Sequence, residues 1–364
     1  MDAARAHAAR AHLERIAARP RAAGSDEERA ARAYCAERLR ALGFTVREEP
    51  FEYSAAPGRA GTPLAGLCAI VMVGAAAVAG ARGDAAVALG ILCAGAVLVA
   101  MAAALLARRG VTDLPVMRAT GVNLVAVRGA PRVWLVAHLD SKSQPIPIAV
   151  RALGVMGSIG VWVLAACTAL AQWRGVGVAS WWPVLAVLAV VAGAPVAASV
   201  VRNRSPGALD DASGVATVLL AAERVGAAHP LGVLLTSAEE LGLAGSRAWA
   251  RHMAPGTAIN VDGVDDTGGM RLIWSRRRPA WLLSALSRAA AAEGVAASSS
   301  RLVPGVLLDG VALADAGWDV ATVSRGSWRT VARIHTAHDD LRSLSGAGAS
   351  LAASVVARAL EEVA

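Results

Sequence analysis

Two histidines and several carboxylates in this sequence stand where apolar, strand-like runs end or where a helix begins. Open α/β proteins place their sites at the carboxyl ends of their strands. Imidazole and carboxylate are both ligands of zinc and related cations. Two histidines and three carboxylates at successive strand ends therefore predict the ligands of two cations, and the imidazoles favour zinc. The proposed ligands are His138, Asp210, Glu240, Asp262 and His335, with Asp140, Asp211 and Glu239 beside them.

Each of these residues also has a structural interpretation when it is taken alone. A histidine in a His-x-Asp motif can be a hydrogen-bonded core residue, and Asp210 and Asp211 can cap a helix. Glu239 and Glu240 can complement a helix dipole. Charge favours the metal interpretation, because Asp210, Glu240 and Asp262 with a shared hydroxide bring four negative charges, which two Zn²⁺ would neutralise. Unpaired carboxylates would not stay ionised when buried.

The elements that must position these residues alternate between strands and helices. Ser25 followed by Glu28 is a capping-box pattern, which predicts a helix to Leu42. The strands 121–127 and 132–137 are separated by a short Gly-Pro segment and are expected to be neighbours. The other expected strands are 44–53, 231–236, 257–261, 269–275 and 318–324, and the other expected helices are 211–226, 243–253, 278–292 and 346–362. This order predicts an α/β fold, a mostly parallel mixed sheet with helices on both faces.

The composition requires a second environment besides water. Hydrophobic residues make up 55% of the 364 residues, which is too many for an ordinary soluble enzyme. A bilayer-spanning helix needs about 20 apolar residues. The intervals without a charged residue that satisfy this length are 60–81, 85–107, 152–173 and 175–201. They form two closely spaced pairs, so the sequence predicts two transmembrane hairpins.

The hairpins interrupt one globular domain twice. Residues 1–59, 108–151 and 202–364 are expected to form the α/β domain, whereas 60–107 and 152–201 form the hairpins. We expect tryptophans at the membrane interface of the second hairpin and glycines that permit close helix contact. These residues are Trp173, Trp181 and Trp182, and Gly154, Gly157 and Gly160. No charged residue lies inside a span, which argues against a transporter or channel.

Charge and cysteine content exclude several other classes. The net charge of +8 comes from arginines spread over the whole chain, so we predict no nucleic-acid partner. The four cysteines include no Cys-x-x-Cys motif, which argues against a cysteine-bound metal and a disulfide framework. The first residues have no apolar run typical of a secretory signal. Arginines concentrate at the span ends nearest the globular pieces, which predicts a multi-pass cell-membrane protein with its globular domain and both termini in the cytoplasm.

The ordered motifs of this sequence resemble the co-catalytic dizinc exopeptidases related to bacterial leucyl aminopeptidase, aminopeptidase Y and glutamate carboxypeptidase. The resemblance covers nearly all residues outside the hairpins and none within them. Pro20–Ser25 and Leu42–Phe44 are also similar to that family's opening segment. The motifs are His138-Leu139-Asp140-Ser141, Pro206 to Gly214, Ala238 to Ser246, Asn260-Val261-Asp262 and Ile334-His335-Thr336.

The resemblance implies roles for the matched residues. Asp210 would bridge two zinc ions, His138 and Asp262 would complete one site, and Glu240 and His335 the other. Glu239 matches the general base, Asp140 would orient His138, and the peptide before Asp211 would be cis. This family often has asparagine at position 211 and a histidine after the acid that corresponds to Asp309, and these departures bear on specificity. Asp309 and Asp339 are candidates for supporting contacts, and Arg276–Arg278 for binding a substrate carboxylate.

A membrane-anchored dizinc exopeptidase, most simply an aminopeptidase acting on short peptides, is the leading functional hypothesis. The alternatives are carboxypeptidase or deacylase activity at the same site, and a catalytically silent membrane scaffold of the same fold. The second hairpin begins 12 residues after Asp140 and ends nine before Asp210. We therefore expect the active site near the bilayer surface, which favours hydrophobic or membrane-released peptides. No oligomer is predicted.

Overall fold

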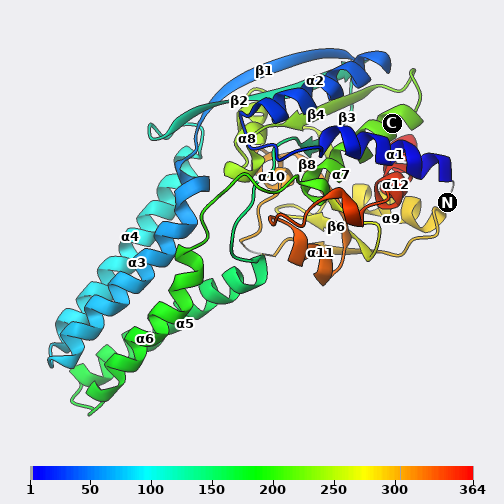
Figure 1. Cartoon of the computed structure of the whole chain (residues 1–364). Coiled ribbons are helices and arrows are strands. Elements are labelled where there is room, and N and C mark those ends of the chain that lie inside the picture. The colour runs from blue at the N-terminus through cyan, green and yellow to red at the C-terminus, as the bar shows by residue number, and fades with distance from the viewer. Residues whose placement is uncertain (1–2, 304, 364) are drawn as a thin grey trace. The chain divides into compact units, whose positions relative to one another are not determined.

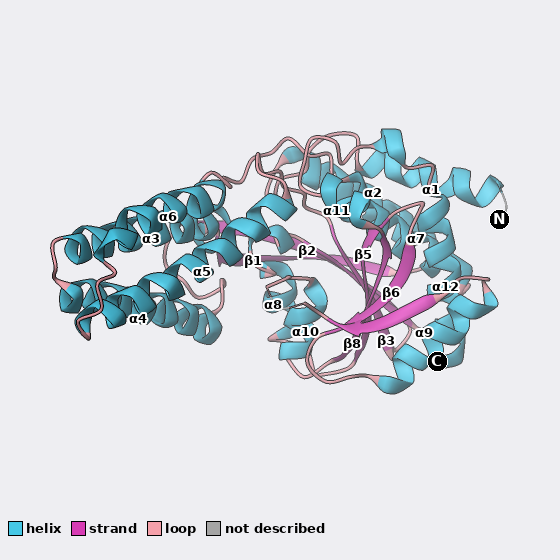
Figure 2. Cartoon of the chain, turned by 90° about the horizontal axis from the view of Figure 1, so that it is seen from below, coloured by secondary structure: helices cyan, strands magenta, loops and turns pink. Residues whose placement is uncertain are grey.

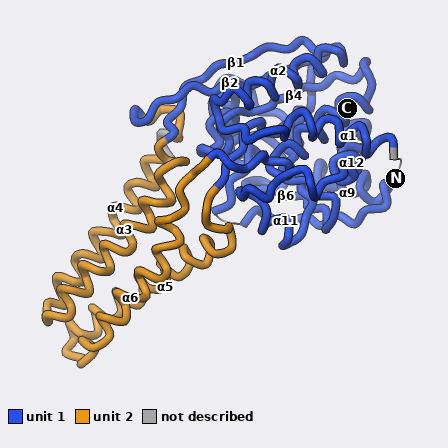
Figure 3. The backbone as a smooth tube through the Cα atoms, viewed as in Figure 1, with its two compact units in different colours: residues 1–55, 115–143, 203–364 blue, residues 56–114, 144–202 orange. Residues whose placement is uncertain are grey.

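The computed structural model describes residues 3–303 and 305–363, and the chain divides into two compact units (Figure 3). Unit 1 comprises Met1–Ala55, Pro115–Ser143 and Asn203–Ala364, and unit 2 comprises Ala56–Leu114 and Gln144–Arg202. Unit 2 is therefore built from two insertions into the sequence of unit 1.

A mixed eight-stranded sheet of described residues forms the centre of unit 1, in the order β1-β2-β4-β3-β5-β8-β6-β7. The neighbours β4, β3, β5 and β8 are parallel. Strand β2 runs antiparallel to β1 and β4, and β6 runs antiparallel to β8 but parallel to β7. The predicted α/β fold is confirmed. The strands are β1 (Thr45–Ser54), β2 (Arg118–Arg128), β3 (Val133–His138), β4 (Leu231–Thr236), β5 (Thr257–Val264), β6 (Gly269–Trp274), β7 (Ala297–Arg301) and β8 (Asp319–Gly326).

The prediction that β2 and β3 are neighbours is wrong, because β4 lies between them. Leu234 of β4 pairs with Val125 of β2 on one side and with Val136 of β3 on the other. All six residues of β4 are buried. A strand this apolar is stabilised by pairing on both sides, since an edge position would expose it to solvent.

Helices cover both faces of the sheet, and side chains alternate between two cores. Leu135 belongs to the larger core, whereas Trp134 and Val136 point into the other. Figure 2 shows α8 and α10 on one side of the strands and α9 and α12 on the other, and Figure 1 shows α12 (red) beside α1 (blue). The helices are α1 (Ala3–Ile16), α2 (Asp26–Ala41), α7 (Ser213–Arg224), α8 (Ala244–Ala250), α9 (Ala280–Ala292), α10 (Asp309–Asp315), α11 (Trp328–Arg333) and α12 (Ala347–Val363).

Unit 2 is a bundle of the helices α3 (Ala56–Ala81), α4 (Ala85–Arg109), α5 (Ile148–Trp173) and α6 (Trp182–Ala197). Among the described residues, four helices are long and apolar enough to cross a membrane by length and composition. The fourth span is shorter than the predicted 175–201, because helix runs only from Ala179, in the short turn η1 (Ala179–Trp181), to Ala197.

Small residues allow close packing inside unit 2, though not all at the predicted positions. A Cβ on Gly154 would lie 2.8 Å from the Ala192 carbonyl oxygen, so close contact there is confirmed, but a Cβ on Gly160 would meet nothing within 4 Å. Trp182 lies inside the bundle and not on its outer surface. Its ring is fully buried against Gly80, and its indole N–H donates to Gln172 Oε1 at 2.6 Å.

Candidate metal centre

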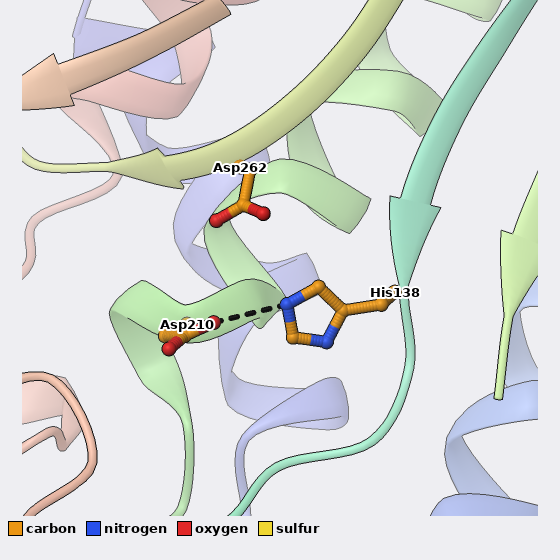
Figure 4. A group of neighbouring side chains, drawn as sticks. All are labelled: His138, Asp210 and Asp262. Carbon is orange, nitrogen blue, oxygen red and sulfur yellow. Dashed lines mark hydrogen bonds and ion pairs between the residues drawn. The ribbon is translucent and has the colours of Figure 1, made fainter. Parts of the chain in front are cut away.

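Three of the predicted ligands meet at the carboxyl edge of the parallel strands. His138 is the last residue of β3, Asp262 lies near the end of β5, and Asp210 lies in the turn η2 (Ala208–Ala212) before α7. His138 Nε2 is 2.9 Å from Asp210 Oδ1. One potential ligand atom from each of the three residues lies within 4.8 Å of the others, and Figure 4 shows the three side chains converging.

The other two predicted ligands form a second group on the opposite oxygen of Asp210. Asp210 Oδ2 is 3.0 Å from His335 Nε2, and the same nitrogen is 3.1 Å from Glu240 Oε1. The potential ligand atoms of this group also lie within 4.8 Å of one another. Asp210 therefore belongs to both groups through different oxygens, which is the geometry expected of a carboxylate that bridges two cations.

Asp140 supports the centre in two ways. Its backbone carbonyl contacts His138 Nδ1 at 2.9 Å, whereas its carboxylate Oδ1 is 3.8 Å from that nitrogen. The carboxylate instead accepts the backbone N–H groups of Glu239 at 3.0 Å and Glu240 at 3.2 Å. These two glutamates form the turn η3 (Glu239–Leu241) after β4. The loop after β3 thus fixes both an imidazole and the glutamate turn.

Two further aspartates hold the Asp210 turn. The buried carboxylate of Asp339 accepts the N–H groups of Leu209 at 2.6 Å and Asp210 at 3.2 Å. Asp211 is fully buried and accepts the backbone N–H of His138 at 3.3 Å. The peptide between Asp210 and Asp211 is cis, as the family resemblance implied. Asp309 accepts the hydroxyl hydrogen of Thr236, at the end of β4.

Sequence reasoning assigned no role to three residues that support the centre. Arg21 is buried and donates to the carbonyls of Leu139, at 2.8 Å, and Gly207, at 3.1 Å, so it joins the loops that carry His138 and Asp210. The only signal for this role was its place in the family's opening segment.

Two further residues support the centre without a role assigned from the sequence, Asn123 and Lys142. Asn123 Oδ1 accepts the N–H of Ser237 at 3.1 Å and its Nδ2 donates to Gly245, which brackets the glutamate turn. The sequence signal for Asn123 was its polar side chain inside an apolar strand. Lys142 Nζ lies 2.7 Å from Glu240 Oε2. Its signal was that it is the chain's single lysine.

The candidate substrate anchor Arg276–Arg278 lies elsewhere. Arg276 pairs with Asp315 at 2.5 Å and Arg277 with Asp319 at 2.7 Å, where β8 begins. That end of β8 is opposite to the edge that carries the metal ligands. Arg276 and Arg277 therefore form solvated ion pairs away from the centre.

Crowded carboxylates control ionisation in this centre. Burial raises the pKa of Glu239 well above its usual value, with neighbouring carboxylates adding to the effect, and burial raises the pKa of Asp262 to about 7. Burial also acts to raise the pKa of Asp210, but hydrogen bonds from His138 and His335 hold it well below its usual range. Although burial acts to lower them, the neighbouring carboxylates raise the pKa values of His138 and His335, and two divalent cations would supply positive charge at the same positions.

The donor set fits zinc. Each group offers one imidazole nitrogen and two carboxylates, and three such protein ligands leave the fourth position of a zinc ion open to water or substrate. The sequence matches the model of peptidase family M28 over residues 123–360.

This chain belongs to peptidase family M28. The assignment confirms the resemblance to co-catalytic dizinc exopeptidases and identifies the M28 protein as a metallopeptidase, for which the family implies zinc. A comparison with curated protein sequences gives no match.

Solved structures share the fold of this M28 protein. The aminopeptidase from Aneurinibacillus sp. strain AM-1 has a TM-score of 0.58 at 14% identity, covering 98% of this chain and 93% of its own. The zinc aminopeptidase BSAP from Bacillus subtilis has a TM-score of 0.57 at 15% identity, covering 98% and 95%. A glutaminyl cyclase from Porphyromonas gingivalis has a TM-score of 0.56 at 15% identity, covering 99% and 98%. The fold therefore hosts more than one reaction, and the family match is what favours peptide hydrolysis here.

Proposed function

We propose that this M28 protein is a membrane-anchored exopeptidase with two zinc ions, and that it removes the N-terminal residue of short peptides. One observation carries the proposal. The two oxygens of Asp210 face different imidazoles, with Asp262 completing one group and Glu240 the other. A shared carboxylate between two complete ligand groups supports a two-metal centre better than a single site.

The chain's own residues supply the acid–base chemistry. Two bound zinc ions would lower the pKa of a shared water and polarise the scissile carbonyl. Glu239 is buried beside Glu240 but belongs to neither ligand group. Its carboxylate would take the proton of the attacking water and deliver it to the leaving amine. Asp140 holds the Glu239 backbone, which keeps this carboxylate at the centre.

The deciding experiment compares wild type with Glu239→Gln on aminoacyl amides and on the same amides with an N-acetyl group. We expect cleavage of free-amine substrates only, and a loss of about 10²–10⁴ in kcat for the variant with zinc content unchanged. Glu27→Gln, a half-buried acid in the first turn of α2, is the matched control. Cleavage of acetylated substrates would overturn the aminopeptidase assignment, and absence of bound zinc in wild type would indicate the silent scaffold.

The membrane part of the proposal rests on α3, α4, α5 and α6. Their outward faces carry large apolar side chains such as Leu98 of α4, Ile159 of α5 and Val191 of α6. The arginine distribution favours unit 1 and both termini in the cytoplasm. Cysteine labelling in intact cells tests this topology. We expect a cysteine at Gly83, between α3 and α4, to react with an impermeant reagent and a cysteine at Glu362 to be protected, and the reverse pattern would overturn the orientation.

A further inference from the structure

Every connection between the sheet and the apolar helices leaves from the same end of the strands, the carboxyl edge at which the parallel strands finish. β3 ends at His138 and leads to α5, and α6 leads back to the Asp210 turn. β2 is antiparallel to β4, so its first residue Arg118 lies towards the end at which β4 finishes. Ser54, the last residue of β1, pairs with Arg118. The chain therefore enters and leaves both helix pairs at the edge that carries the metal ligands.

The length of these connections limits how far that edge can lie from a membrane. His138 and Ile148, the first residue of α5, are ten positions apart, so an extended chain spans at most about 35 Å between them. Only Ala55 separates Ser54 from the start of α3. This bound follows from chain connectivity alone, and it limits the distance between His138 and the first turn of α5.

The same edge exposes large apolar side chains. Trp328 follows the end of β8 by two residues and is 75% exposed, and Val331 lies one helical turn further along α11. Isolated apolar residues are common on surfaces, but clusters that flank a site are typical of contact surfaces. We call Trp328 and Val331 the apolar rim.

The residues around the rim suit a lipid headgroup region. Arg329 lies over the Trp328 ring, with its guanidinium carbon 5.5 Å from the ring centre. Tryptophan is enriched at membrane interfaces, and arginines near a membrane surface are attracted to anionic lipids. The apolar helices also connect to the sheet at this edge, which favours a lipid bilayer as the surface that the rim contacts.

We propose that the apolar rim contacts the lipid bilayer and that the enzyme takes peptides whose cleavable end is presented from that bilayer. This inference rests on the membrane anchoring proposed above. Burying the rim at the interface would place the mouth of the metal centre where a membrane-associated peptide end emerges. Peptides that partition into the interface would then be concentrated at the site relative to fully soluble peptides.

Lipid contact can be measured with an environment-sensitive fluorophore on single cysteines of the full chain. The native cysteines at 35, 68, 93 and 167 are replaced by serine, and the label is placed through Trp328→Cys. The chain is reconstituted in vesicles of phosphatidylcholine and phosphatidylglycerol that carry spin-labelled phosphatidylcholine as quencher. Leu164→Cys, on the exposed face of α5, reports whether the helices span the bilayer.

Trp281→Cys is the matched control for the rim. Trp281 is also exposed, but it follows β6, whose end lies at the opposite edge because β6 is antiparallel to β8. We expect the spin-labelled lipid to quench the fluorophore at Leu164→Cys and at Trp328→Cys but not at Trp281→Cys. Quenching at 164 without quenching at 328 would overturn the rim and leave the anchoring intact, whereas no quenching at 164 would overturn the anchoring itself. Protection of a label at Trp328→Cys from both lipid and aqueous quenchers would indicate that a second copy of the chain covers the rim, and it would overturn lipid contact.

Kinetics test the substrate class separately. The same peptide is offered with and without a C-terminal lipid anchor, and kcat/KM is compared for wild type, the double variant Trp328→Glu with Val331→Glu, and Trp281→Glu. We expect the anchored-to-soluble ratio to fall about tenfold in the double variant, which corresponds to about 1.4 kcal/mol, and to stay unchanged in Trp281→Glu. An unchanged ratio in the double variant would overturn the substrate assignment, even if the rim is quenched by lipid.

Discussion

The Asp140 carboxylate accepts the backbone N–H of Glu239 at 3.0 Å, so a residue of the loop after β3 holds the proposed general base that follows β4. Asp140→Asn keeps the side-chain shape but replaces one acceptor oxygen with a donor. We expect kcat to fall about 10- to 100-fold, as for other residues that support metal ligands, with zinc content retained. The measurement is steady-state hydrolysis of an aminoacyl amide.

The matched control for this variant is Asp26→Asn. Asp26 is an exposed acid that pairs with Arg29 on the surface of α2. Its substitution should leave kcat unchanged. Wild-type kcat in Asp140→Asn would mean that the Glu239 turn holds its position without this hydrogen bond.

Metal content should depend on which ligand is removed. Asp210 belongs to both ligand groups, whereas Asp262 belongs to one. We expect Asp210→Ala to lose both zinc ions and Asp262→Ala to lose one, against about two per chain in wild type. Elemental analysis of the dialysed proteins measures this directly. Equal loss in the two variants would contradict a bridging role for Asp210.

Much of the site could be predicted because its chemistry lies in residue types at strand ends. His138, Asp210 and Asp262 are recognisable as an imidazole and two acids next to apolar runs, and the structure brings them together. Arg21 and Asn123 carry no such signal. Each acts through hydrogen bonds to backbone groups that are distant in sequence, so its role exists only after the chain has folded.

The fold shows the same division between local and non-local information. The α2 start was predictable, since Ser25 Oγ accepts the N–H of Glu28 at 3.2 Å within one turn. The position of β4 between β2 and β3 was not, because a short connection indicates neighbouring strands unless a later strand inserts. The strand β7 was not predicted either. Its Ser298 and Ser299 are exposed at the sheet edge and lack the apolar alternation of a buried strand.

Stability at acidic pH should depend on His12. Burial, with the charge of Arg38 adding to it, lowers the pKa of His12 to about 4 from 6.5, and its Nδ1 is 2.8 Å from the Tyr34 hydroxyl oxygen. Because the folded-state pKa lies below the unfolded value, the neutral imidazole contributes stability above pH 6.5. That contribution is lost as the pH falls towards 4.

His12→Gln removes this titration. Between pH values of about 7 and 4, we expect the unfolding free energy of wild type to fall by about 2 to 3 kcal/mol more than that of the variant. Urea unfolding in detergent, followed by tryptophan fluorescence, measures the difference. Parallel pH profiles for the two proteins would show that His12 does not titrate on unfolding.

Close packing in unit 2 should make it sensitive to single methyl groups at particular glycines. A Cβ on Gly66 of α3 would lie 2.4 Å from the backbone nitrogen of Ala197 and 2.8 Å from the Gly193 carbonyl oxygen. Backbone atoms cannot move aside as a flexible side chain can, so Gly66→Ala must separate α3 from α6. We expect the free energy of unfolding to fall by about 1 to 3 kcal/mol, the usual cost of overpacking. A lower thermal unfolding midpoint in detergent measures this loss.

Gly160→Ala is the matched control, because a Cβ there would meet nothing within 4 Å. It should leave the midpoint unchanged or raise it slightly, since alanine favours helix more than glycine. Equal midpoints for the two variants would contradict the close approach of α3 and α6.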